Sequence, residues 1–229
     1  MDDALRLRAR TARAAVASGA LRGAALLELL QSIALVDRDA WADELLGIEP
    51  PPPDVADLPR GAVPYLPCGV DEIAAMVRDA PLAPDDELVD LGAGLGRAVI
   101  LAHLLSGARS RGIEIQQPLV QRARTLCAEL ALDAVSFVHG NAADVALDGS
   151  VFFLYAPCNG EMLTRVVRRL EELARRRAIV VCAVGVELRD APWLTARTSS
   201  CASLALYDSQ VRAVPGDRFA APGCEGETA

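Results

Sequence analysis

A glycine-rich stretch, Leu88-Val-Asp-Leu-Gly-Ala-Gly-Leu-Gly-Arg97, is the part of the sequence whose residue types and spacing most clearly suggest chemistry. An apolar run leads into Gly92, Gly94 and Gly96, and a helical pattern follows directly. Glycines at such a strand-to-helix turn let the backbone approach a ligand closely, and the helix N-terminus offers free N–H groups to a polar or anionic group. The stretch therefore predicts a loop that binds a small ligand.

Two carboxylates accompany this loop. Asp90 stands two residues before the first glycine, and Glu114 ends the next expected strand, where a carboxylate can accept both ribose hydroxyls of a nucleoside. A dinucleotide site has the spacing G-x-G-x-x-G, whereas this chain has G-x-G-x-G. Asp90 would also repel a pyrophosphate but suits the ammonium group of a methionine moiety. These residues favour S-adenosyl-L-methionine over a dinucleotide as the cofactor.

The elements that must position these residues follow a strand–helix alternation. Such alternation predicts an α/β fold with a doubly wound, mostly parallel seven-stranded sheet. A final stretch, 195–212, loses helical periodicity and reads as two strands that could form a hairpin. The expected strands before it are 87–91, 110–115, 135–139, 150–155 and 178–184, and the expected helices are 71–80, 95–106, 118–131 and 161–176.

The first 49 residues read differently, as an N-terminal helical extension. Helical patterns cover 4–18 and 21–36, and Asp37 or Asp39 could cap a third helix that runs to about Leu46. This extension could act as a cap or lid over a binding site, or as a dimerisation element that would make the protein a homodimer rather than a monomer.

Prolines then divide the extension from the rest of the chain. Four of them, Pro50–Pro53, open a proline-rich linker over 50–62. The expected cofactor-binding domain covers 63–214, and residues 215–229 form a Gly- and Pro-bearing tail that we expect to be loose.

Composition narrows the function classes. The net charge is −8 and all 23 basic residues are arginine, so no lysine is present to form a Schiff base, and nucleic-acid binding through a basic face is disfavoured. The six cysteines stand singly, which argues against a zinc site, and we expect no bound metal. The N-terminus lacks a signal-peptide pattern and no apolar run could span a membrane, so we expect a protein of the cytoplasm.

At this point the sequence from Val63 to Arg212 resembles the class I, seven-β-strand S-adenosylmethionine-dependent methyltransferases. The resemblance implies that Asp90 and the three glycines hold the methionine part and that Glu114 holds the ribose. It places Asn141 and Ala142 beside the adenine, in a segment where the family often has Asp. Asp144 is an alternative for the adenine contact, or else a loop or capping residue.

Three further segments are similar to the small seven-strand protein-lysine methyltransferases. They are Val63-Pro-Tyr-Leu-Pro67, Gly112-Ile-Glu-Ile115 and Phe153-Leu-Tyr-Ala-Pro-Cys158. The last segment lacks the Asn-Pro-Pro-Tyr signature of adenine, cytosine or glutamine methylation, so DNA is not an expected partner. The resemblance implies transfer of a methyl group to a nitrogen of a protein side chain, with a small metabolite as the alternative acceptor.

The acceptor pocket is expected around Tyr155 and Tyr65, with Asn159 hydrogen-bonding nearby. Aromatic faces can attract a sulfonium or an ammonium, and correct positioning supplies most of the rate in an in-line displacement. Either tyrosine could instead be packed with its hydroxyl at the surface. His139 could act as a base but is more often structural at such a position, and Cys158 could line the pocket as a thiol. A non-catalytic nucleoside-binding scaffold and a dinucleotide oxidoreductase are the competing functions.

Overall fold

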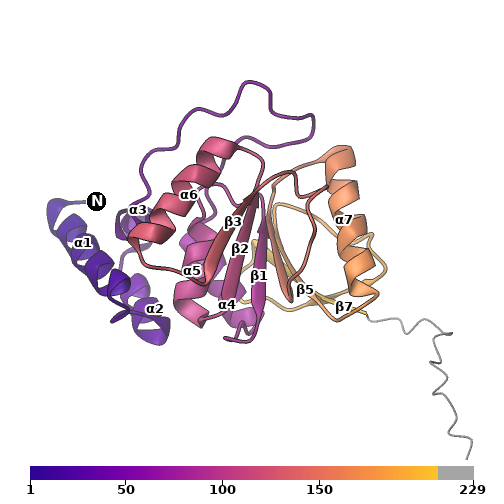
Figure 1. Cartoon of the computed structure of the whole chain (residues 1–229). Coiled ribbons are helices and arrows are strands. Elements are labelled where there is room, and N and C mark those ends of the chain that lie inside the picture. Colours follow the sequence, from indigo (N-terminus) through magenta and orange to yellow (C-terminus); the bar gives the residue numbers. More distant parts are fainter. Residues whose placement is uncertain (211–229) are drawn as a thin grey trace, which may run out of the picture.

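Seven strands form one sheet in the order β3-β2-β1-β4-β5-β7-β6, and helices lie on both of its faces (Figure 1). This computed structural model describes residues 1–210. Strands β1 to β5 run parallel, whereas β7 is antiparallel to both β5 and β6. The predicted doubly wound, mostly parallel sheet is therefore confirmed. The strands are β1 Glu87–Leu91, β2 Arg109–Glu114, β3 Val135–His139, β4 Val151–Tyr155, β5 Val180–Val184, β6 Leu194–Arg197 and β7 Leu204–Ser209.

The two faces of the sheet carry different helices because neighbouring strand residues point to opposite sides. On one face, Phe153 and Cys182 pack in a hydrophobic cluster with three helices, whereas on the other Phe152 and Val181 pack against one. The helices of the first face are α4 Val70–Asp79, α5 Arg97–Ser106 and α6 Gln117–Glu129, and the helix of the second is α7 Gly160–Ala174. The predicted tail, 215–229, lies outside the described residues.

The N-terminal extension folds as α1 Asp3–Ala17, α2 Gly23–Gln31 and α3 Leu35–Leu46. The expected continuous helix over 21–36 is wrong, because the chain turns at residues 32–34. Leu30 and Ile33 on the two sides of this turn are both buried, so the apolar repeat continues through the break and periodicity could not reveal it.

The expected caps of the third helix are also wrong. The residue at the cap position of α3 is Ala34. Asp37 lies in the first turn of the helix and forms a salt bridge with the Met1 amino group at 3.0 Å. Asp39 serves a different helix, since its Oδ1 accepts a hydrogen bond at 2.9 Å from the N–H of Val70, the first residue of α4. The residue type was a correct signal for capping, but the helix that it caps is distant in sequence.

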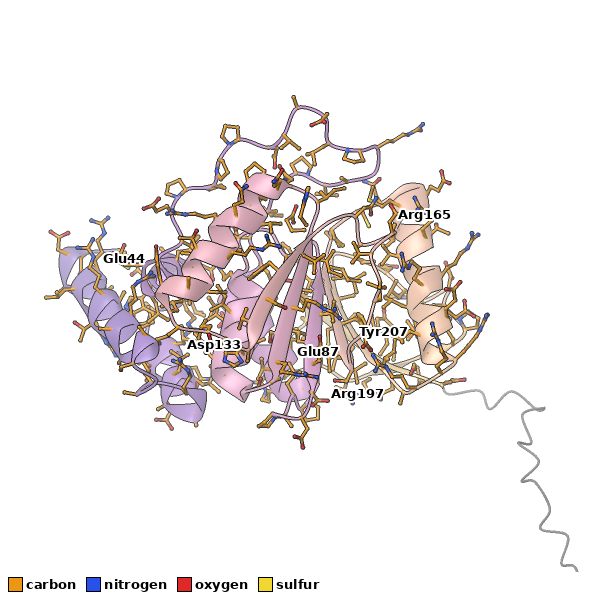
Figure 2. The ribbon with its side chains drawn as sticks, viewed as in Figure 1. Glu44, Glu87, Asp133, Arg165, Arg197 and Tyr207 are labelled. Atoms are coloured by element: carbon orange, nitrogen blue, oxygen red, sulfur yellow. The ribbon has the colours of Figure 1, made fainter. Side chains whose placement is uncertain are left out.

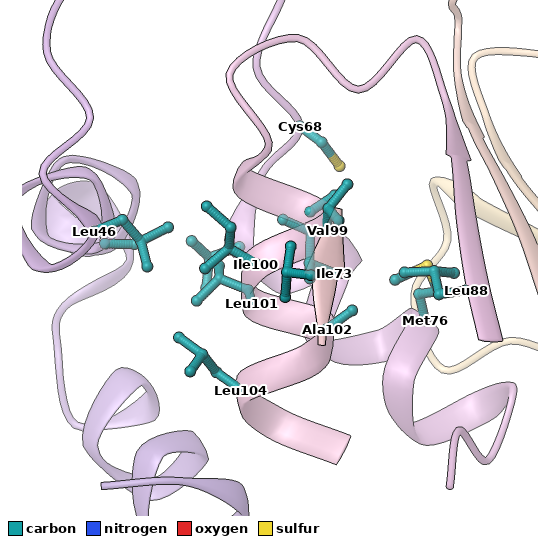
Figure 3. Close-up of a cluster of buried hydrophobic side chains, with 14 of the residues drawn as sticks. Leu46, Cys68, Ile73, Met76, Leu88, Val99, Ile100, Leu101, Ala102 and Leu104 are labelled. Carbon is teal, nitrogen blue, oxygen red and sulfur yellow. The ribbon is translucent and has the colours of Figure 1, made fainter. Parts of the chain in front are cut away.

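Helix α5 explains why the extension packs as it does. Almost all of its residues are buried, including Ile100 and Leu101, so it has apolar side chains on every side. The sheet and α4 cover part of this surface, and residues of α1, α2 and α3 join the same hydrophobic cluster. Figure 3 shows Leu46 of α3 beside Ile100 and Leu101, on the other side of α5 from Leu88 of β1.

Residues 48–69, which we call the strap, join α3 to α4 and cross the carboxyl end of the sheet (Figure 1). The strap contains the four prolines and the segment around Tyr65. It is held to the chain after β4 by an isolated bridge between Ala62 and Cys158 and by a hydrogen bond from Asn159 N to Gly61 O of 2.8 Å. No helix within residues 1–210 is long and apolar enough to cross a membrane.

Candidate functional site

The carboxyl ends of β1, β2 and β4 meet in the middle of the sheet, where two adjoining cavities lie. The residues Tyr65, Leu66, Gly92 and Tyr155 line both of them. The β2-side cavity is further lined by Glu114, Gln116, Asn141, Ala142, Pro157 and Cys158, and the β1-side cavity by Cys68, Asp90, Ala93 and Arg97. The structure thus brings most of the residues singled out from the sequence to one place.

Asp90 is a buried carboxylate with an oxygen that lacks a partner. Its side chain is 3% exposed, and its Oδ1 has no hydrogen-bond partner within residues 1–210. Burial, with a smaller contribution from the charge of Glu114, raises the pKa of Asp90 to about 8. Because a buried polar atom without a partner is costly, this oxygen is suited to a ligand that brings a hydrogen-bond donor or a positive charge.

Glu114 ends the neighbouring strand, and its carboxylate is held firmly. Its Oε2 accepts a hydrogen bond from Gly94 N at 2.9 Å, and its Oε1 accepts one from Gln116 N at 2.7 Å. Each carboxylate oxygen can accept more than one bond, so lone pairs remain for ligand hydroxyls. Burial raises the pKa of Glu114 even though these N–H groups favour its charged form.

The glycine loop is shaped by neighbouring side chains as well as by any ligand. Gly94 has a φ of +54°, and a Cβ at this position would lie 2.2 Å from the Tyr65 ring. A Cβ on Gly92 would lie 2.5 Å from Pro157, and one on Gly96 would lie 2.4 Å from Phe137. The sequence-based reason for these glycines, room for a ligand, is therefore incomplete, because the first atoms in that room belong to the protein.

The residues expected at the acceptor end separate into two groups. Tyr65 and Tyr155 are half-buried and line both cavities, and burial raises the pKa of Tyr65 to about 12. Asn159 is exposed, lines neither cavity, and begins α7 as its cap residue without a side-chain hydrogen bond to the helix. Cys158 is buried at the cavity wall, where burial raises the pKa of its thiol to about 11, which does not favour a nucleophile.

At the far end of the β2-side cavity, Asn141 and Ala142 form part of the wall. The Asn141 Oδ1 accepts a hydrogen bond from Ala143 N at 2.9 Å and keeps a second lone pair. Asp144, the alternative adenine contact, is absent from both walls and forms an ion pair with Arg165 on α7 (Figure 2). His139 is exposed, and its Nε2 lies 3.1 Å from Ile115 O, which agrees with a structural role.

Four residues at the site carry no sequence-based prediction. Gln116 is buried and ties the strap to β2, since its Nε2 donates to Asp54 Oδ1 at 2.7 Å and its Oε1 accepts from Val55 N at 3.0 Å. Asp54 Oδ1 also accepts from Tyr65 N at 3.0 Å. Arg97 and Cys68 line the β1-side cavity. Of these four residues, Gln116 alone had a position in the sequence that could have suggested a place at the site, because it lies two residues after Glu114.

The chain resembles known proteins in its structure, whereas its sequence matches none of the known families. No protein-family model matches the sequence, and no curated protein matches it. An RNA methyltransferase from Salinibacter ruber, solved with S-adenosyl-L-homocysteine, is 25% identical with a TM-score of 0.52, and the match covers 66% of this chain and 98% of that one.

Two further solved structures share the fold. The first is yhhF from Escherichia coli, a proposed methyltransferase, at 20% identity and a TM-score of 0.53, with 68% of this chain and 91% of that one covered. The second is a mutant of MtNAS in complex with S-adenosylmethionine, at 15% identity and a TM-score of 0.51, with 62% and 63% covered. Together, the sheet order and these neighbours show that the chain has the class I, seven-β-strand methyltransferase fold, and the Salinibacter ruber neighbour supports an enzyme that uses S-adenosylmethionine.

Proposed function

We propose that the chain transfers a methyl group from S-adenosylmethionine to a side-chain nitrogen of a protein, with lysine as the acceptor. The observation that carries the proposal is the pair of half-buried tyrosines, Tyr65 and Tyr155, on the walls shared by the two cavities. Aromatic rings at this place suit a cationic side chain that must lose a proton and face a sulfonium. The net charge of −8 also favours a basic substrate.

The cofactor fits the residues that surround the two cavities. The unpartnered Oδ1 of Asp90 is suited to the amino group of the methionine part, and the lone pairs of Glu114 are suited to the ribose hydroxyls. Asn141 and Ala142 would border the adenine. When bound, S-adenosylmethionine supplies an electrophilic methyl group on a sulfonium.

In this proposal the protein contributes positioning and the exclusion of water. Tyr65 and Tyr155 would align the acceptor nitrogen with the methyl group, and the strap residue Leu66, which is 60% exposed beside them, would contact the apolar stem of the side chain. Burial raises the pKa of the Tyr155 hydroxyl, so it stays a neutral hydrogen-bonding group near neutral pH. We assign no general base, because in-line transfer to an uncharged amine needs none at the transition state.

The test is transfer of tritium from labelled S-adenosylmethionine to a panel of proteins, RNA and metabolites from the source cell, with Tyr155→Ala and Tyr65→Ala as site variants that remove the rings. We expect label in protein, at lysine after hydrolysis, and weaker labelling by both variants. Label confined to metabolites would establish the small-molecule alternative, and label confined to RNA would place the chain with the function named for its Salinibacter ruber neighbour.

A further inference from the structure

Helix α3 does not pack on the sheet, but it contacts the wall of the candidate site through one buried arginine, Arg97. Arg97 is the first residue of α5, directly after the glycine loop, and is 6% exposed. Its Nε and Nη2 donate to the two carboxylate oxygens of Asp43, at 2.8 Å and 2.5 Å. A bidentate arginine–carboxylate pair fixes orientation as well as charge.

The same guanidinium also holds the strap. Arg97 Nη1 donates to the carbonyl oxygen of Cys68 at 2.8 Å, in a buried hydrogen bond. One turn before Asp43 on α3, Asp39 accepts the hydrogen bond from Val70 N. Two carboxylates of α3 therefore fix the chain on both sides of Gly69, one directly and one through Arg97.

The segment fixed in this way forms part of the cavity wall. Residues 65 to 68 line the β1-side cavity, and the Tyr65 ring lies against Gly94 of the glycine loop. A change at Asp43 would release the Cys68 carbonyl and, through it, the placement of Tyr65. Arg97 and Asp43 are 54 residues apart in the sequence, so this contact depends on how α3 packs beside α5.

We propose that Asp43 is a positioning residue of the cofactor site, and that α3 is a fixed part of this site rather than a lid or a dimerisation arm. The inference rests on the proposed function insofar as the cavities take S-adenosylmethionine. Asp43 itself touches no cavity in this arrangement and acts through Arg97, so its effect must appear at residues 65–70.

The test compares three variants of the full chain, Asp43→Asn, Asp43→Glu and Glu44→Gln, by calorimetric binding of S-adenosylhomocysteine and by amide hydrogen exchange over 63–72. Glu44 is the matched control because it is the next residue of α3 and pairs with Arg10 away from the site (Figure 2). We expect Asp43→Asn to bind about ten-fold more weakly, since a loosened segment must be ordered on binding. Exchange over 63–72 should be faster in that variant, while Asp43→Glu should restore most of the affinity and Glu44→Gln should match the native chain.

A second variant keeps the proposal testable if Asp43→Asn does not fold. Asp43→Asn leaves the buried Arg97 with the Cys68 carbonyl and with the Asp39 carboxylate at 4.0 Å, but without its bidentate partner. The double variant Asp43→Leu/Arg97→Met replaces the ion pair with apolar side chains, which is often tolerated. Weaker binding by this folded double variant, together with faster amide exchange over 63–72, would support the proposal. Native affinity in either folded variant, or an equal loss in Glu44→Gln, would overturn it. Absence of binding to the native chain would instead overturn the cofactor assignment.

Discussion

The two walls of the candidate site are built in different ways. The sheet wall consists of the ends of β1 and β2 with Asp90, the glycine loop and Glu114, and the side-chain hydrogen bonds of Glu114 join residues only 20 and 2 positions apart, from Gly94 N and Gln116 N. The strap wall is irregular, and side chains 29 to 62 positions away hold it, namely Arg97, Asp39 and Gln116. The comparison teaches that regular secondary structure positions the expected cofactor contacts, whereas scattered polar contacts position the wall with Tyr65.

The largest effect should come from the sheet wall. Asp90→Ala removes a buried carboxylate with an unpartnered oxygen, so affinity for S-adenosylhomocysteine should fall by about 100-fold, the equivalent of a charged hydrogen bond of about 3 kcal/mol. Calorimetry measures this. Asp133→Ala, at an exposed loop residue before β3, is the control and should bind as the native chain does (Figure 2). Equal binding by Asp90→Ala would remove the sheet wall from the cofactor site.

A methyl group at the contact between the two walls should have the next largest effect. Gly94→Ala must displace the Tyr65 ring, and we expect about ten-fold weaker binding of S-adenosylhomocysteine. Gly19→Ala is the matched control, because Gly19 also has a positive φ, +78°, but its added Cβ would meet nothing within 4 Å. Both variants should lose about 1 kcal/mol of stability from backbone strain. If the control loses as much affinity as Gly94→Ala, the contact with Tyr65 is irrelevant.

The strap wall alone can be loosened at Gln116. Gln116→Ala removes the side-chain hydrogen bonds to Asp54 and to Val55 N, so dissociation of S-adenosylhomocysteine should become about five-fold faster by stopped-flow measurement, the equivalent of about 1 kcal/mol. The exposed Gln121→Ala on α6 serves as the control. An unchanged dissociation rate in Gln116→Ala would mean that the strap does not close over the bound ligand.

The last prediction concerns the stability of the ligand-free protein rather than ligand affinity. Because burial raises the folded-state pKa of Asp90 from 3.8 to about 8, its contribution to stability is full below pH 4 and is lost as the pH rises to about 8. Asp90→Asn cannot ionise, so between pH 5 and pH 8.5 the native melting temperature should fall by about ten degrees more than that of the variant. Scanning calorimetry checks this, and parallel pH dependences in the two proteins would show that Asp90 has no such shift.

The sequence could predict the sheet wall because each of its signals is local. Asp90, the glycines and Glu114 can be recognised from their residue types and from their positions at the ends of apolar runs that predict strands. The parallel order of these strands then brings the strand ends together. The place of Tyr155 at the site could be predicted for the same reason, because Tyr155 is the last residue of β4. Asn159 shows the limit, since it lies four residues after Tyr155 and lines neither cavity. The roles of all these residues in binding remain predictions.

What the sequence by itself determined was the α/β class, the methyltransferase fold and the cofactor type, because period, glycine spacing and strand-end carboxylates are readable within short windows. Only the tertiary structure decided that α1, α2 and α3 cover α5, and that Asp39 caps α4 while Asp43 pairs with Arg97. From a short stretch of sequence, an aspartate on a helix is predicted to face solvent. Its partner is set by how two helices pack, and that depends on buried side chains from the whole chain.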